Sequence, residues 1–164
     1  MTIASALPIA GFIGCVLTAA ISDARTLRIP NVLCAAIAVL FAAHAAFALN
    51  GAQIAWSIGL ALLTLVAGFI AFARGKIGGG DVKLLSVCMA WAGPAHAVEF
   101  LIVTGLAGGV IALALLSPRL VRSTIGLQRQ WPQAAMHTGT RAPMPYGVAI
   151  AAGALVVAGR MMAA

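Results

Sequence analysis

The stretch Gly78-Gly79-Gly80-Asp81-Val82-Lys83-Leu84-Leu85 joins three consecutive glycines to an acid that opens a long apolar run. Acidic residues are scarce, because the 164 residues contain only Asp23, Asp81 and Glu99. Glycine has no Cβ and tolerates positive φ, so another backbone can approach the Asp81 carboxylate closely. The stretch therefore predicts an acidic site that an extended peptide can reach.

The composition indicates that most of the chain lies in lipid. Apolar residues make up 63% of the sequence and charged residues 8%, and the mean hydropathy is +1.09. These values lie far outside the range of soluble domains. A net charge of +7 would suggest nucleic acid for a soluble chain, but here the basic residues fall in short connections between apolar runs. We expect a polytopic membrane protein that contacts lipid and binds no nucleic acid.

The apolar runs predict an all-α fold of about six transmembrane helices, formed by one domain over residues 1–164. We expect spans at residues 3–22, 32–49, 54–73 and 144–159, and two further crossings within 84–116. Gly93-Pro94 breaks the run 84–116 near its middle. Two crossings are tight in that length, so we expect the fourth helix to be short and to begin below the membrane surface.

The basic residues predict how the helices are oriented. Connections 23–31 and 74–83 and a long loop at 117–143 are basic, so they should be cytoplasmic. The connection 50–53 carries no charge and should lie outside, as should both termini. Every basic residue except Arg160 then lies on one side. Asp23 and Asp81 are separated by two spans and should share the cytoplasmic face.

Two carboxylates on one face suggest a reaction. Close carboxylates cannot both ionise cheaply, so they share a proton. One can act as a base toward water while the other polarises a carbonyl, which is the division of labour that amide hydrolysis requires. Cys15, Cys34 and Cys88 form no CxxC and have no histidine at ligand spacing. We therefore expect neither a metal nor another cofactor.

These residues resemble a known signature. Asp23 followed by Ile29-Pro30-Asn31, and then the stretch from Gly78 to Leu84, is similar to the two-aspartate pattern of type IV prepilin peptidases of the GxGD class. Pro145-Tyr146-Gly147 resembles the Pro-aromatic-Gly element that opens the last helix in that family. The resemblance covers the whole chain and is greatest to compact, peptidase-only members associated with Flp or Tad pili. We find no N-terminal domain with paired CxxC motifs and expect no methyltransferase activity.

The resemblance implies an aspartyl endopeptidase of the bacterial inner membrane. Asp23 and Asp81 would be catalytic and would face the cytoplasm. The implied substrate is a prepilin or pseudopilin, whose short basic leader is cleaved after a glycine and just before the apolar helix. Residues expected to bind substrate or support the site are Gly78, Gly79, Gly80, Lys83, Pro30, Asn31 and Tyr146.

Each of these residues also has a structural interpretation. Asp81 could cap a helix, and Asp23 could pair with Arg25 or Arg28. Lys83 fits an interface anchor better than a catalytic partner. Glu99 should lie near the outer face, across the membrane from both aspartates.

Two other functions are compatible with the sequence. A small proton- or cation-coupled transporter would use the two aspartates as ion sites, but it would favour acids near the bilayer midplane and repeated halves. A non-catalytic assembly subunit of a pilus system would keep the topology and tolerate loss of either aspartate.

Overall fold

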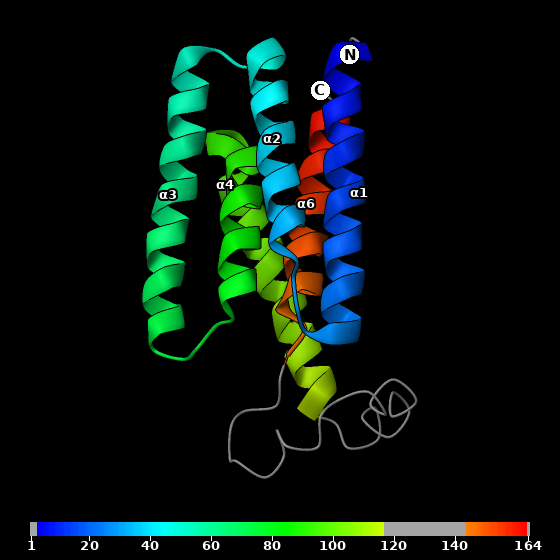
Figure 1. Cartoon of the computed structure of the whole chain (residues 1–164), viewed down its shortest axis with the longest axis vertical. Coiled ribbons are helices and arrows are strands. Elements are labelled where there is room, and N and C mark those ends of the chain that lie inside the picture. Colours follow the sequence, from blue (N-terminus) through cyan, green and yellow to red (C-terminus); the bar gives the residue numbers. More distant parts are fainter. Residues whose placement is uncertain (1–2, 117–143, 164) are drawn as a thin grey trace.

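The computed structural model describes residues 3–116 and 144–163, which form one bundle of helices (Figure 1). The all-α prediction is confirmed, because these residues contain no strand. Five helices are long and apolar enough to cross a membrane. The predicted basic loop at 117–143 lies outside the described residues. The helices are α1 (Ile3–Thr26), α2 (Asn31–Ala48), α3 (Gly51–Ala73), α4 (Gly79–Leu116) and α6 (Tyr146–Ala163).

The connection between α2 and α3 is shorter than predicted, because its polar residues start the next helix. The Asn50 side chain accepts a 2.9 Å hydrogen bond from the Gln53 N–H, and the Gln53 side chain accepts a 3.0 Å bond from the Asn50 N–H. This reciprocal pair is a capping box, which satisfies two backbone donors that a helix start leaves unpaired. As a result α3 begins at Gly51 instead of Ile54.

Helix α4 consists of two helical segments that meet at Gly93. This residue has φ 55° and ψ −170°, a backbone conformation that favours glycine, and Pro94 follows it. The predicted break at Gly93-Pro94 is therefore confirmed. A Cβ on Gly93 would also lie 2.9 Å from the Ser57 hydroxyl of α3. The chain reverses here, so that α4 first rises beside α3 and then descends (Figure 1).

The first segment of α4 runs antiparallel to α3. A Cβ on Gly79 would lie 3.4 Å from the Phe72 ring, and one on Gly68 would lie 2.7 Å from the Val82 side chain. This segment thus begins level with the last turn of α3. Its expected start below the membrane surface stays a prediction, because it depends on where the bilayer lies. The segment turns back beside Ser57, so it ends before it reaches the level of the start of α3.

The second segment of α4 runs antiparallel to α6. Thr104 and Phe100 pack directly on Gly153, whose missing side chain allows the two helices to approach closely. Near the reversal, Glu99 pairs with Arg160 close to the end of α6. Helix α6 also packs along α1, which places it between the second segment and α1.

The bundle has two distinct ends (Figure 1). The α1–α2 and α3–α4 connections and the start of α6 lie at one end, which we call the aspartate end because Asp23 and Asp81 lie there. The start of α1 and the end of α6 lie at the opposite end, which we call the terminal end.

Trp91 is the centre of the core toward the terminal end. Its ring stacks on Phe12 with 4.3 Å between centroids and on His44 with 5.2 Å between centroids. Its indole N–H donates a 3.1 Å hydrogen bond to the Ile37 carbonyl. Trp91 therefore ties the first segment of α4 to α1 and α2.

Candidate active site

Asp23 lies in the last turn of α1, where its side chain is only 4% exposed. Its Oδ2 accepts a 2.7 Å hydrogen bond from the backbone N–H of Gly147 in the first turn of α6. A helix start leaves such N–H groups without intrahelical partners. A Cβ on Gly147 would lie 2.8 Å from Oδ2 and 3.0 Å from Cγ. The bare glycine thus lets α6 close directly onto the carboxylate, and neither Arg25 nor Arg28 forms an ion pair with it.

The residues after Asp23 end α1 in a fixed turn. Leu27 has φ 53°, which is rare for a leucine, and its N–H donates a 2.8 Å hydrogen bond to the Asp23 carbonyl. The Ser22 hydroxyl donates a 2.8 Å hydrogen bond to the Arg28 carbonyl. These bonds fold the connection over the end of α1, where Leu27, Arg28 and Ile29 become part of a cavity wall.

Asp81 is the third residue of α4 and is half-buried. Its carboxylate accepts a hydrogen bond from the N–H of Gly78, the residue that precedes the helix. The Val82 N–H donates to the Gly78 carbonyl at 3.2 Å, so the helical bonding starts at this glycine. An acid at the third position that binds back in this way forms one half of a capping box. Asp81 therefore stabilises the helix start, but from a position different from the N-cap considered in the sequence.

The triple glycine provides space around Asp81. A Cβ on Gly78 would lie 2.9 Å from Asp81 Oδ2, and one on Gly80 would lie 3.3 Å from the Ile29 Cβ. None of the three glycines has a positive φ. The three glycines are therefore needed here because they have no side chain, and not because they can adopt a positive φ. The missing side chain of Gly80 lets the α1–α2 connection lie next to the start of α4.

One cavity of about 690 Å³ contains both aspartates. Asp23 reaches it from α1 and Asp81 from α4, and the two carboxylates are close enough for the charge of one to act on the other. A cavity of this size lies in the range of small-ligand sites. Its remaining wall comes from Leu27, Arg28, Ile29, Asn31, Gly75, Lys76, Ile77, Gly78, Gly79, Gly80, Met144 and Tyr146.

The predicted supporting residues fall into two groups. The triple glycine, Asn31 and Tyr146 line the cavity together with the aspartates. Lys83 and Pro30 do not belong to the wall. Lys83 Nζ instead donates a 2.9 Å hydrogen bond to Asn31 Oδ1, and Pro30 is the residue that precedes α2, not a residue of its first turn. Lys83 thus contacts the cavity wall through Asn31.

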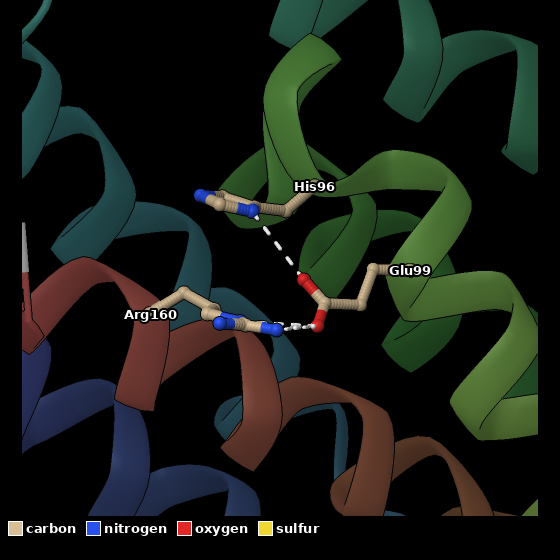
Figure 2. Close-up of polar contacts among 3 residues, drawn as sticks. All are labelled: His96, Glu99 and Arg160. Carbon is tan, nitrogen blue, oxygen red and sulfur yellow. Dashed lines mark hydrogen bonds and ion pairs between the residues drawn. The ribbon is translucent and has the colours of Figure 1, made fainter.

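Glu99 forms an ion pair with Arg160 and lies beside His96 (Figure 2). Arg160 donates to its Oε1 from Nη2 at 2.9 Å and from Nε at 3.1 Å. His96 Nδ1 lies 3.6 Å from Oε2. The cluster joins the second segment of α4 to α6 near the terminal end. Glu99 therefore lies away from the cavity, as the charge pattern predicted.

Metal ligands do not gather in the part of the chain that the structure describes. No group of three or more His, Cys, Asp or Glu residues within these ranges could hold an ion. The donor set of the cavity is two carboxylates with backbone and amide groups. Independence from metal stays a prediction for activity measurements.

Comparison with known families gives the context for this geometry. The sequence model of the type IV leader peptidase family matches residues 10–113, which is more than half of the chain. The chain belongs to the type IV leader peptidase family. The matched region holds both Asp23 and Asp81 and ends before α6 begins. No curated protein and no solved structure gives a significant match. Membership indicates a membrane protease of the prepilin peptidase kind and implies prepilin substrates.

Proposed function

We propose that this leader peptidase is an aspartyl endopeptidase that removes the short basic leader of Flp-like type IV prepilins or pseudopilins. The observation that carries the proposal is the placement of Asp23 and Asp81, the only aspartates of the chain, in one cavity. They come from different helices and lie in a protein whose spans otherwise hold a single acid, Glu99. Acids in membrane segments are costly and usually functional.

The pair can hydrolyse an amide when it holds one proton. The ionised carboxylate takes a proton from water, whose oxygen bonds to the carbonyl carbon, while the protonated carboxyl gives its proton to the carbonyl oxygen. In the tetrahedral intermediate one hydroxyl returns a proton to the second carboxylate, the one that protonated the carbonyl oxygen. The first carboxyl is the one that took its proton from water. The first carboxyl then protonates the nitrogen as the C–N bond breaks. The pair ends with one proton, as it began.

The charges support a cytoplasmic site. Basic residues favour the cytoplasmic side of short membrane loops. All the described basic residues except Arg160 lie at the aspartate end. We count the two segments of α4 as separate crossings, because the chain reverses at Gly93. The proposed topology then has six crossings of a bacterial inner membrane and both termini outside. The basic residues at the aspartate end are Arg25, Arg28, Arg74, Lys76 and Lys83.

A cation-coupled transporter is the alternative function. It would be favoured by acids midway along the helices, where an ion can be reached from both sides in turn. Asp23 is instead in the last turn of α1 and Asp81 in the first turn of α4. Both positions, together with family membership, support the peptidase.

The proposal is tested by expressing the chain with an Flp-like prepilin and measuring the size of the precursor on a gel. We expect conversion to the shorter form in membranes that contain the wild-type chain. Mass spectrometry should place the cut after the leader glycine. Absence of cleavage by a well-expressed protein, with ion uptake into vesicles in its place, would favour the transporter.

A further inference from the structure

An apolar groove runs between α2 and α3 and is not part of the catalytic cavity. It has a volume of about 420 Å³, and α2, α3 and the first segment of α4 line it with four residues each. Helix α3 packs on α4 and makes at most marginal contact with α2, although the two helices are consecutive. The groove therefore opens sideways between two neighbouring helices of the bundle.

Small side chains form part of the groove wall on all three helices. Ala35 and Ala38 contribute from α2, Ala61 from α3, and Ser86 and Ala90 from α4. Ala38 is exposed, and Ala61 is half-buried. In lipid, small residues at a helix surface let a second backbone approach closely, and the resulting van der Waals packing favours helix association.

One end of the groove lies next to the catalytic cavity. On α2, Asn31 lines the cavity and Cys34 lines the groove, about 4.5 Å apart along the helix axis. On α4, Asp81 lines the cavity and Lys83 the groove, about 3 Å apart along the axis. The 2.9 Å hydrogen bond from Lys83 to Asn31 crosses this boundary. A chain that lies in the groove would thus reach the aspartates as it leaves the groove's end.

We propose that this groove binds the apolar transmembrane helix of the precursor and that the precursor enters sideways between α2 and α3. The inference rests on the proposed function, in which the scissile bond directly precedes an apolar helix. The helix would pack on the alanines of the groove, and the extended segment before it would cross the Lys83–Asn31 boundary into the cavity. The position of the groove next to the cavity favours this occupant over a lipid chain or a second copy of the protein.

The test compares substitutions inside and outside the groove. Ala38→Leu and Ala61→Leu, alone and together, add bulk to opposite walls. Ala67→Leu is the matched control, because Ala67 is exposed and lies about two and a half turns after Ile58, on the opposite face of α3. Each variant is assayed in membranes with the full-length precursor, and with a soluble peptide that contains the leader and only the first residues of the mature chain.

The double variant should cleave the full-length precursor at least tenfold more slowly than Ala67→Leu and should cleave the peptide at an unchanged rate. Equal cleavage of the precursor by the two variants would overturn the inference and leave a lipid as the occupant. In that case the proposed function would stand. If neither the wild type nor Ala67→Leu cleaved any precursor, the proposed function itself would fail.

Cross-linking gives a second measurement that does not depend on the peptide. In a cysteine-free, Asp81→Asn background, Ala38→Cys should form disulfides with single cysteines in the precursor's apolar helix. Positions three to four residues apart should react, as expected for one helix face, and Ala67→Cys should react at least tenfold less. Equal reaction of both sites would overturn the inference. So would an Ala38→Cys cross-link between two enzyme copies that the precursor does not displace.

Discussion

The backbone N–H of Gly147 lies 2.7 Å from Oδ2 of Asp23, so the first turn of the last helix holds the carboxylate at the end of the first helix. The bond closes the bundle at the aspartate end, where α1, α4 and α6 meet around one cavity. The family match ends at residue 113, so α6 supplies this contact from outside the matched region. The position of the Asp23 carboxylate therefore depends on a residue at the opposite end of the sequence.

Gly147→Ala should reduce cleavage about 100-fold, because the new Cβ would lie 2.8 Å from Oδ2 and displace the carboxylate. Gly159→Ala is the matched control, since a Cβ on this glycine of the same helix meets nothing within 4 Å. The measurement is the initial rate of precursor cleavage by each variant, in membranes that contain equal amounts of the two proteins. Cleavage by Gly147→Ala at the rate of Gly159→Ala would mean that the close contact is unimportant.

Hydropathy was enough to predict the described helices, and the Gly93-Pro94 pair predicted the break within α4. A run of apolar residues needs a helix in lipid, because the backbone must satisfy its own hydrogen bonds there. A short first segment of α4 was predicted as well, and its expected start below the membrane surface stays a prediction. How far this segment extends along α3 depends on the packing of the two helices, where Gly68 receives the Val82 side chain. A hydropathy pattern contains no such information.

The aspartates were found from the sequence because acids are so rare in it. Their surroundings were only partly predicted. Tyr146 and Asn31 line the cavity, whereas Gly147 was quoted within its Pro-Tyr-Gly element and given no role of its own. A glycine that serves as a point of close approach looks like any other glycine in an alanine-rich helix. The contact becomes visible only when α1 and α6 are placed side by side.

The orientation of the bundle can be tested by labelling. In a cysteine-free background, Gly51→Cys at the start of α3 and Lys76→Cys after its end should react with an impermeant maleimide from opposite sides of the membrane. Both positions are exposed and lie at opposite ends of one helix. We expect Gly51→Cys to react in intact cells and Lys76→Cys only after permeabilisation. Reaction of Lys76→Cys in intact cells would contradict a cytoplasmic site.

Metal removal should leave cleavage unchanged, because the proposed reaction uses only carboxylates and water. Membranes treated with EDTA or 1,10-phenanthroline and then washed should retain their full rate of precursor conversion. A zinc metalloprotease treated in parallel shows that the chelator works. Loss of activity that zinc restores would be incompatible with the two-aspartate mechanism.

Asp23→Asn and Asp81→Asn keep the size of each side chain but remove a carboxylate from the pair. Each variant should lower cleavage by about 1,000-fold or more, and the double variant should be no worse, because residues that act as one unit lose nearly everything at the first substitution. Glu99→Gln is the control acid: it lies near the terminal end and should stay active. Gel-shift rates, corrected for expression by immunoblot, provide the measurement. Near-normal cleavage by either single variant would show that its aspartate only stabilises a helix end.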